Sequence, residues 1–178
     1  MVSLKLEIAQ SPPFSSLEEE ALLNLLRTAD SLHRAFHRST REWGVTSTQY
    51  NVLRILRGAQ PQGLRCSEIG ERMITAEPDI TRLLARLKAL KLIRQQRDRH
   101  DRRVVWTQIA ESGLKLLKEM DPVILKMPVD LLGHLSKDEL SELIRLLESA
   151  RSKVSDAQAP AEPVSCTGEL CSDQQPQQ

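Results

Sequence analysis

The fold is decided by residues 80–109, which read ITRLLARLKALKLIRQQRDRHDRRVVWTQI. In the first third of this stretch, apolar residues recur every three or four positions, as they do on one face of a helix: Ile80, Leu83, Leu84, Leu87 and Leu90. That period then ends, and residues 92–97 and 102–109 resemble two strands joined by a polar turn at 98–101. The stretch therefore predicts a helix followed by a charged β-hairpin.

Two shorter helices are expected immediately upstream of this stretch. Residues 46–49, Thr-Ser-Thr-Gln, form a capping box at the start of a helix that runs to about residue 57. After a loop, Ser67 is expected to cap a helix over 68–73. The helix of the deciding stretch is expected to begin at Thr75 or Ala76. The result is a helix-turn-helix with a hairpin behind it.

This order of elements predicts a mainly α protein with a small β-wing, that is, a winged helix-turn-helix. The winged-helix core is expected over about 44–110. Amphipathic helices flank it over about 17–40 and 111–154. Pro122 and Pro128 predict a kink or a break in the second of these regions.

The remaining segments lie outside this domain, which spans 16–154. Residues 1–15 contain two adjacent prolines and little periodicity, so we expect a flexible arm. Residues 155–178 contain four acids and no Lys or Arg, which predicts a disordered acidic tail. Cys166 and Cys171 lie in that tail, and the sequence assigns them no role.

The charge of the chain is concentrated in one segment. The whole chain carries +1, whereas residues 82–103 hold nine basic and two acidic residues and carry +7. The rest of the chain therefore carries −6. Such a basic segment is typical of a polyanion site, and nucleic acid is the first candidate.

The composition excludes several other classes of protein. No run of 18 apolar residues and no apolar signal core is present, so we expect a cytoplasmic protein with no membrane partner. The sequence holds no convincing nucleophile–base pair, carboxylate dyad or Gly-rich phosphate loop, so we expect no enzyme and no cofactor. His33 and His37 share a helix face at metal-ligand spacing, but no third ligand accompanies them, and we expect no metal site.

Several short motifs, in this order and at these spacings, resemble the MarR family of bacterial transcriptional regulators. They are Ser67-Glu68-Ile69, the run from Ile80 to Leu87, Leu92-Ile93, Asp101-Arg102-Arg103 and Glu111-Ser112-Gly113. Two positions depart from the family pattern. Lys91 stands where a Gly commonly ends the recognition helix, and Ala110 stands where a Thr usually caps the next helix.

The resemblance implies a homodimer that binds double-stranded DNA, in which the regions of about 17–40 and 111–154 would serve as N- and C-terminal dimerisation helices. Its two recognition helices would lie about 34 Å apart and read a near-palindromic operator. It further implies a repressor that a small-molecule effector releases from the operator. The alternative is a winged-helix protein-interaction module without specific DNA readout, which we would expect to carry fewer arginines on the recognition helix and wing.

The residues expected to face DNA on the recognition helix lie on its polar face and in its first turn: Pro78, Asp79, Thr81, Arg82 and Arg86. Arg82 and Arg86 are expected to contact phosphates or guanine edges. The other interpretation is a solvated face on which Asp79 pairs with one of these arginines. Thr81 could contact a thymine methyl group or a phosphate, and Asp79 could accept a hydrogen bond from cytosine or orient an arginine.

The hairpin tip contributes a second set of expected contacts: Arg99, Asp101, Arg102 and Arg103. Arg99 and Arg102 are expected to bind the DNA backbone. Asp101 is expected to hold the guanidinium of Arg103 in one rotamer before Arg103 enters the minor groove. The alternative is an exposed surface ion pair that contributes about 0–1 kcal/mol.

The resemblance also places an effector pocket between the helices expected over about 17–40 and 46–57 and the dimer junction. The candidates by location are His33, Phe36, His37, Trp43 and Tyr50. Core packing explains the aromatic residues equally well.

Overall fold

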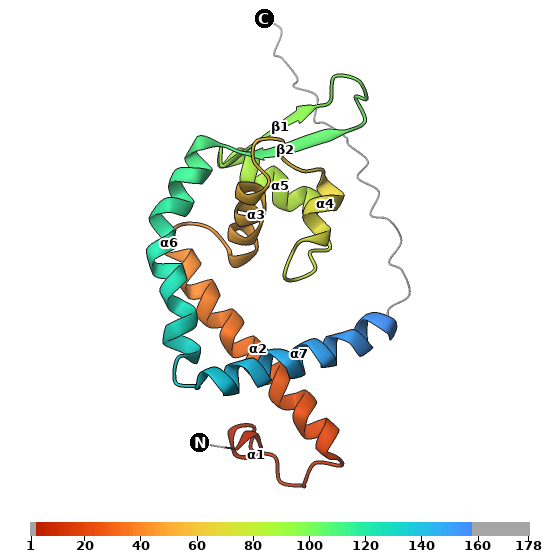
Figure 1. The fold of residues 1–178 in the computed structure, drawn as a ribbon, viewed down its shortest axis with the longest axis vertical. Coiled ribbons are helices and arrows are strands. Elements are labelled where there is room, and N and C mark those ends of the chain that lie inside the picture. The colour runs from red at the N-terminus through yellow and green to blue at the C-terminus, as the bar shows by residue number, and fades with distance from the viewer. Residues whose placement is uncertain (1–2, 158–178) are drawn as a thin grey trace, which may run out of the picture.

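The computed structural model describes residues 3–157. Its elements follow one another in the order shown in Figure 1: α1 (Leu4–Glu7), α2 (Leu17–Arg41), α3 (Ser47–Gly58), α4 (Cys66–Glu71), α5 (Ile80–Ala89), β1 (Ile93–Arg97), β2 (Val105–Ile109), α6 (Glu111–Leu132) and α7 (Lys137–Ala157). The strands are antiparallel, and their register runs from Ile93 opposite Ile109 to Arg97 opposite Val105. The architecture is the predicted one, mainly α with a two-stranded wing.

One apolar core joins α3, α4, α5, the base of the hairpin and the first half of α6. Its fully buried side chains include Val52, Leu53, Leu56, Ile69, Leu87, Leu117 and Met120. Complete burial of one such side chain contributes about 1.5–3 kcal/mol. This cluster therefore dominates the stability of the winged-helix unit.

Gly63 allows the loop after α3 to approach the hairpin. Its φ is +78°, and a Cβ atom there would lie 2.4 Å from the carbonyl oxygen of Thr107. The next residue, Leu64, exchanges two backbone hydrogen bonds with Thr107, of 2.9 and 2.8 Å. Only glycine combines this left-handed conformation with so close an approach, so Gly63 helps to fix the wing against the core.

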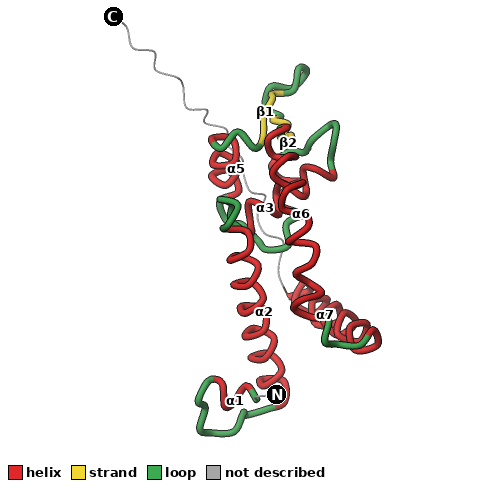
Figure 2. Tube along the Cα trace, turned by 90° about the vertical axis from the view of Figure 1, so that its left-hand side faces the viewer, coloured by secondary structure: helices red, strands yellow, loops and turns green. Residues whose placement is uncertain are grey.

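The long helices extend away from this unit. In Figure 1 α2 runs from the core toward α1, and Glu7, the last residue of α1, pairs with Arg27 of α2 at 3.5 Å. Figure 2 shows that α7 turns away from α2 at the far end of α6. Only Thr40 is buried along α2, and no side chain of α7 up to Val154 is buried.

Two helix starts differ from the sequence prediction. The helix expected after Ser67 begins at Cys66, with Arg65 as its N-cap and the Glu68 carboxylate accepting from the Arg65 N–H at 2.8 Å. Helix α5 begins at Ile80 rather than near Thr75, so Pro78 precedes the helix instead of lying in its first turn. The reason is that the Asp79 side chain caps α5 by accepting from the Arg82 N–H at 2.9 Å.

Of the kink or break expected in the region 111–154, a break is absent at both prolines, since α6 is continuous through Pro122 and Pro128. Met120 and Ile124, on either side of Pro122, are both buried in the core. Their packing outweighs the hydrogen bond lost at that proline. Within the expected N-terminal arm, the structure has one turn of helix, α1. Cys166, Cys171 and nearly all of the expected tail lie outside the described residues.

Candidate nucleic-acid interface

Helix α5 has one buried face and one basic face. Ile80, Leu83, Leu84 and Leu87 pack into the core, which holds the helix against α4 and β1. The opposite face is exposed and carries Thr81, Arg82, Arg86 and Lys88. A helix with this arrangement presents its arginines outward on a rigid support, as recognition in the major groove requires.

At the N-terminal end of α5, Asp79 has a role that the sequence interpretation did not name. Its Oδ1 atom accepts the Arg82 N–H, so the carboxylate stabilises the first turn of the helix. Among the described residues, Asp79 forms no ion pair with Arg82 or Arg86. Pro78 is exposed directly before it.

Ile74 lies in the turn that leads from α4 to this end of α5. Its side chain is 87% exposed, and its backbone N–H donates to Oδ1 of Asn51 in α3 at 3.0 Å. Sequence patterns do not single out Ile74, because an isolated apolar residue in a turn carries no periodic signal. An apolar side chain held outward beside the recognition helix is suited to contact thymine methyl groups.

The tip of the wing, residues 98–104, is organised by Asp98. One carboxylate oxygen accepts the N–H groups of His100 and Asp101, at 2.8 and 3.1 Å, and the other accepts the Trp106 indole N–H at 2.9 Å. The Trp106 hydrogen bond, followed by those from Asp101 and His100, lowers the pKa of Asp98 from 3.8 to about 2. Asp98 is therefore an anion at neutral pH.

The expected contact between Asp101 and the Arg103 guanidinium is not formed. Asp101 Oδ1 accepts the backbone N–H of Arg103 at 2.9 Å instead, and the two side chains form no ion pair. The prediction named the wrong donor, because an Asp carboxylate readily accepts the backbone N–H two residues later and so closes a local turn. Asp101 orders the backbone on which Arg103 stands and leaves the guanidinium free to bind elsewhere.

All nine basic residues of the segment 82–103 are exposed: Arg82, Arg86, Lys88, Lys91, Arg94, Arg97, Arg99, Arg102 and Arg103. None of them forms an ion pair with a carboxylate between residues 3 and 157. The positive charge of α5 and the wing is thus not neutralised within the described chain. It is available to a polyanion.

The candidate effector residues lie where α2 meets α3. The Phe36 and Tyr50 rings pack edge to face with centroids 5.6 Å apart, and the Tyr50 hydroxyl accepts from Arg54 at 3.1 Å. The Trp43 indole Nε1 is buried without a hydrogen-bond partner. His33 is exposed, and its ring stacks on that of His37 with the two ring centroids 6.5 Å apart.

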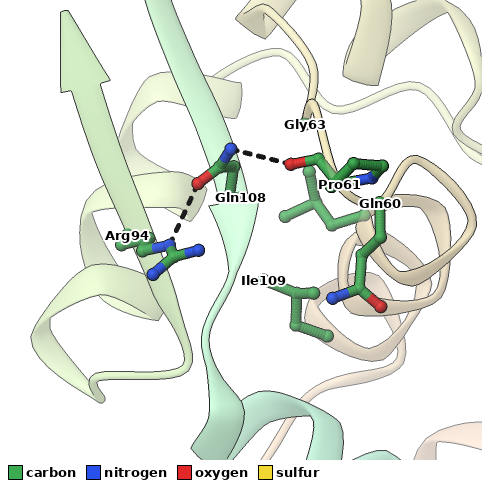
Figure 3. A pocket seen from close by; sticks show the side chains of 7 residues that line it. Gln60, Pro61, Gly63, Arg94, Gln108 and Ile109 are labelled. Atoms are coloured by element: carbon green, nitrogen blue, oxygen red, sulfur yellow. Dashed lines mark hydrogen bonds between the residues drawn. The ribbon is translucent and has the colours of Figure 1, made fainter.

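The hollow drawn in Figure 3 lies elsewhere, between the loop after α3 and the base of the wing. Its volume is about 70 Å³, which suits water rather than a larger ligand. Gln108 crosses it, accepting from Arg94 Nε at 3.0 Å and donating to the Pro61 carbonyl at 2.9 Å. This hollow is part of the attachment of the wing and not of the candidate effector site.

Comparison with known proteins assigns the chain to a family. A sequence profile of the MarR family matches residues 43–104. The HTH-type transcriptional regulator TtmR of Methylorubrum extorquens (strain PA1) is 30% identical over 139 residues, which are 78% of this chain and 69% of TtmR. The chain belongs to the MarR family.

Solved structures agree with this assignment. The MarR transcription factor from Planctomyces limnophilus is 40% identical, with a TM-score of 0.60 over 76% of this chain and 98% of that one. MepR of S. aureus, solved as a DNA complex, is 24% identical and has a TM-score of 0.67 over 73% of this chain and 96% of that one. The second likeness shows the fold alone.

As a MarR-family protein, this chain is a DNA-binding transcriptional regulator and not an enzyme. The family membership favours this function over the alternative of an interaction module without DNA readout. None of the helices between residues 3 and 157 has the length and apolar composition that crossing a bilayer requires. Between the same residues, no group of three or more His, Cys, Asp or Glu side chains could hold a metal ion.

Proposed function

We propose that this MarR-family protein is a cytoplasmic homodimeric repressor that binds a near-palindromic operator and is released by a small-molecule effector. The observation that supports the DNA-facing part is the set of nine exposed basic residues on α5 and the wing without intramolecular ion-pair partners. Phosphate neutralisation by such residues supplies much of the affinity for DNA.

In this proposal, α5 enters the major groove with its N-terminal end foremost. Arg82 and Arg86 contact guanine edges or phosphates, and Thr81 contacts a phosphate or a thymine methyl group. Pro78 and Asp79 lie at the entering end, where Asp79 also caps the helix. The wing contributes Arg99 and Arg102 to the DNA backbone and Arg103 to the minor groove, with Asp101 ordering the Arg103 backbone.

The dimer would form through the long helices, because their apolar residues are left uncovered by the described part of the chain, residues 3–157. These exposed side chains are Leu17, Leu22, Leu25 and Leu26 on α2, Val123, Leu125 and Val129 on α6, and Leu143, Ile144, Leu146 and Val154 on α7. Apolar patches of this extent mark protein–protein contacts in water. A second copy of the chain supplies complementary apolar faces in a closed two-fold arrangement.

The effector would bind where α2 meets α3, near His33, Phe36, His37, Trp43 and Tyr50. The buried and unpartnered Nε1 of Trp43 supports this place, because a ligand oxygen there would satisfy a donor that now lacks an acceptor. Release of DNA requires that the ligand bind one spacing of the two recognition helices more tightly than the other.

The test is fluorescence anisotropy with the DNA upstream of the coding region and an excess of random competitor DNA. Arg103→Ala is expected to weaken binding about tenfold or more, because one arginine contact to a base contributes about 1–3 kcal/mol. Lys115→Ala, which removes an exposed charge on α6, is the control and should bind like the wild type.

The salt dependence provides an independent check of the same proposal. The logarithm of the binding constant should fall with the logarithm of salt concentration, with a slope near −0.9 per phosphate neutralised. A flat salt dependence, or equal binding by Arg103→Ala and the wild type, would contradict the proposed role of the wing.

A further inference from the structure

The tip of the wing combines dense positive charge with one anion that binds inward. Three exposed arginines, at positions 99, 102 and 103, lie within residues 98–104. Asp98 lies at the strand end of the same loop and accepts three hydrogen bonds. An anion at a DNA-facing tip repels phosphates, so an affinity argument based on charge alone would disfavour an acid there.

The geometry of Asp98 divides its two oxygens between two tasks. Oδ1 accepts the N–H groups of His100 and Asp101 and so closes the turn. Oδ2 accepts the Trp106 indole N–H from β2, across the hairpin from β1. The carboxylate thus joins the turn to the strand that follows it. The backbone bond from the Asp98 N–H to the Val104 carbonyl, of 2.9 Å, closes the same loop.

A loop that is already ordered in the free protein lowers the entropic cost of binding DNA. Ordering one residue of a flexible loop costs about 1–2 kcal/mol of backbone entropy, and a loop that is already ordered does not incur this cost when DNA binds. Asp101 supports the same loop from within through the Arg103 N–H. Asp98 is the group that connects this loop to the rigid part of the hairpin.

We infer that Asp98 is a positioning residue for DNA binding. Its hydrogen bond with the Trp106 indole N–H orders the loop that carries the wing arginines before DNA binds. Neither side chain needs to contact DNA. The inference rests on the proposed contact of the wing with DNA, and it adds two residues that were not among the expected contacts.

Two variants test the pair by removing one hydrogen bond from opposite sides. Asp98→Asn keeps an oxygen for the two backbone N–H groups but can turn an amide N–H toward the Trp106 donor. Trp106→Phe keeps an aromatic ring and the net charge but removes the indole N–H. Each variant is expected to weaken operator binding about five- to tenfold, because about one further loop residue must then be ordered when DNA binds.

The sign of the Asp98→Asn effect separates positioning from charge. Removal of a negative charge at the tip strengthens DNA binding if Asp98 acts only through its field. Positioning predicts the opposite sign. Glu119→Gln, an exposed change of the same charge on α6 with no ion pair among the described residues, controls for net charge and should leave affinity unchanged.

The double variant tests whether the two residues act through one bond. Asp98→Asn with Trp106→Phe should bind no more weakly than the weaker single variant, because both changes remove the same interaction. Melting temperatures without DNA should stay close to the wild-type value. The salt slope should become shallower by about 0.9 for each phosphate contact that the misplaced arginines lose, a change that simple loss of fold does not produce.

The indole N–H resonances give a direct structural readout. The chain has two tryptophans, so a ¹H–¹⁵N spectrum contains two such signals, and Trp106→Phe assigns them. Asp98→Asn should shift the Trp106 signal and leave the Trp43 signal in place. If Asp98→Asn fails to fold, the neutral Trp106→Phe variant decides the question by its affinity and salt slope.

The result that overturns the inference is wild-type or tighter binding by Asp98→Asn, or losses in the two single variants that simply add in the double variant. Arg103→Ala in the same assay separates this from failure of the proposed function. Weak binding by Arg103→Ala with normal binding by Asp98→Asn and Trp106→Phe rejects the role of the Asp98–Trp106 pair alone. Normal binding by Arg103→Ala rejects the contact between the wing and DNA on which that role depends.

Discussion

The winged-helix unit buries its apolar residues, whereas the long helices around it leave many of theirs exposed. Helix α3 has 12 residues and buries Tyr50, Val52, Leu53 and Leu56, among others. Helix α2 has 25 residues and buries only Thr40, although leucines are frequent along it. The first region is completed by a single chain, whereas the second has a surface that the described chain does not cover.

An amphipathic pattern predicts a helix but does not identify the partner that packs on its apolar face. The spacing of leucines predicted helices in both regions equally well. In α3 and α5 the apolar face packs against the rest of the same chain, whereas along α7, up to Val154, no side chain is buried. We therefore attribute the uncovered faces to the proposed dimer.

The largest expected effect comes from placing a charge in the uncovered region. Ile144→Glu, on α7 where Ile144 is 56% exposed, should raise the dimer dissociation constant about 100-fold or more. The reason is that an unpaired charge buried in an interface costs about 3–5 kcal/mol. Sedimentation equilibrium measures the dissociation constant, and circular dichroism should show the helices intact.

Ser149→Glu is the matched control for this change, since it adds the same charge at another exposed position of α7. It should leave the dimer intact. A wild-type protein that is monomeric at micromolar concentration, or an Ile144→Glu dimer of normal strength, would contradict the proposed role of this face.

The next effect concerns the completed core. Leu53→Ala removes a side chain with no exposed surface and should lower the free energy of unfolding by about 2–5 kcal/mol through lost burial and a cavity. Urea denaturation measures the change. Leu90→Ala, in which the side chain is about half exposed, should cost far less, and equal losses in both variants would show that the core is not as closed as described.

A smaller effect is expected where the two regions are joined. Arg57 of α3 donates twice to Asp121 of α6, at 2.7 and 3.3 Å, and both side chains are mostly shielded from water. Asp121→Asn should cost about 1 kcal/mol of unfolding free energy. Asp130→Asn breaks the exposed 3.8 Å pair with Lys126 and should change stability by less than the error of the same urea titration.

The smallest effect has the opposite sign. Lys91 ends the recognition helix with a φ of +59°, a left-handed conformation that costs a side-chain-bearing residue about 1–2 kcal/mol. Lys91→Gly should stabilise the protein by about 0.5–1 kcal/mol after the entropy of the added glycine is counted. Lys88→Gly, inside α5, should instead destabilise it by about 1 kcal/mol, and stabilisation by both changes would refute this explanation.

Much of the candidate site could be predicted from sequence, but its hydrogen bonds could not. The basic face of α5 and the charged wing follow from periodicity and from the position of the arginines. The roles of Asp79 and Asp98 depend on which N–H groups lie within reach of a carboxylate. An Asp at the start of a tight turn is a signal that could have pointed to Asp98 as a local acceptor, whereas its bond to Trp106 depends on hairpin register.

By itself, the sequence determined the helices, the wing, the concentration of charge and the family, because period, composition and short motifs are local properties of the chain. Tertiary contacts set the continuity of α6 through Pro122 and the hydrogen bond between Asp98 and Trp106. They also decided which apolar faces stay uncovered. These outcomes depend on which groups meet in space, and burial and hydrogen bonding act between partners that the local pattern does not identify.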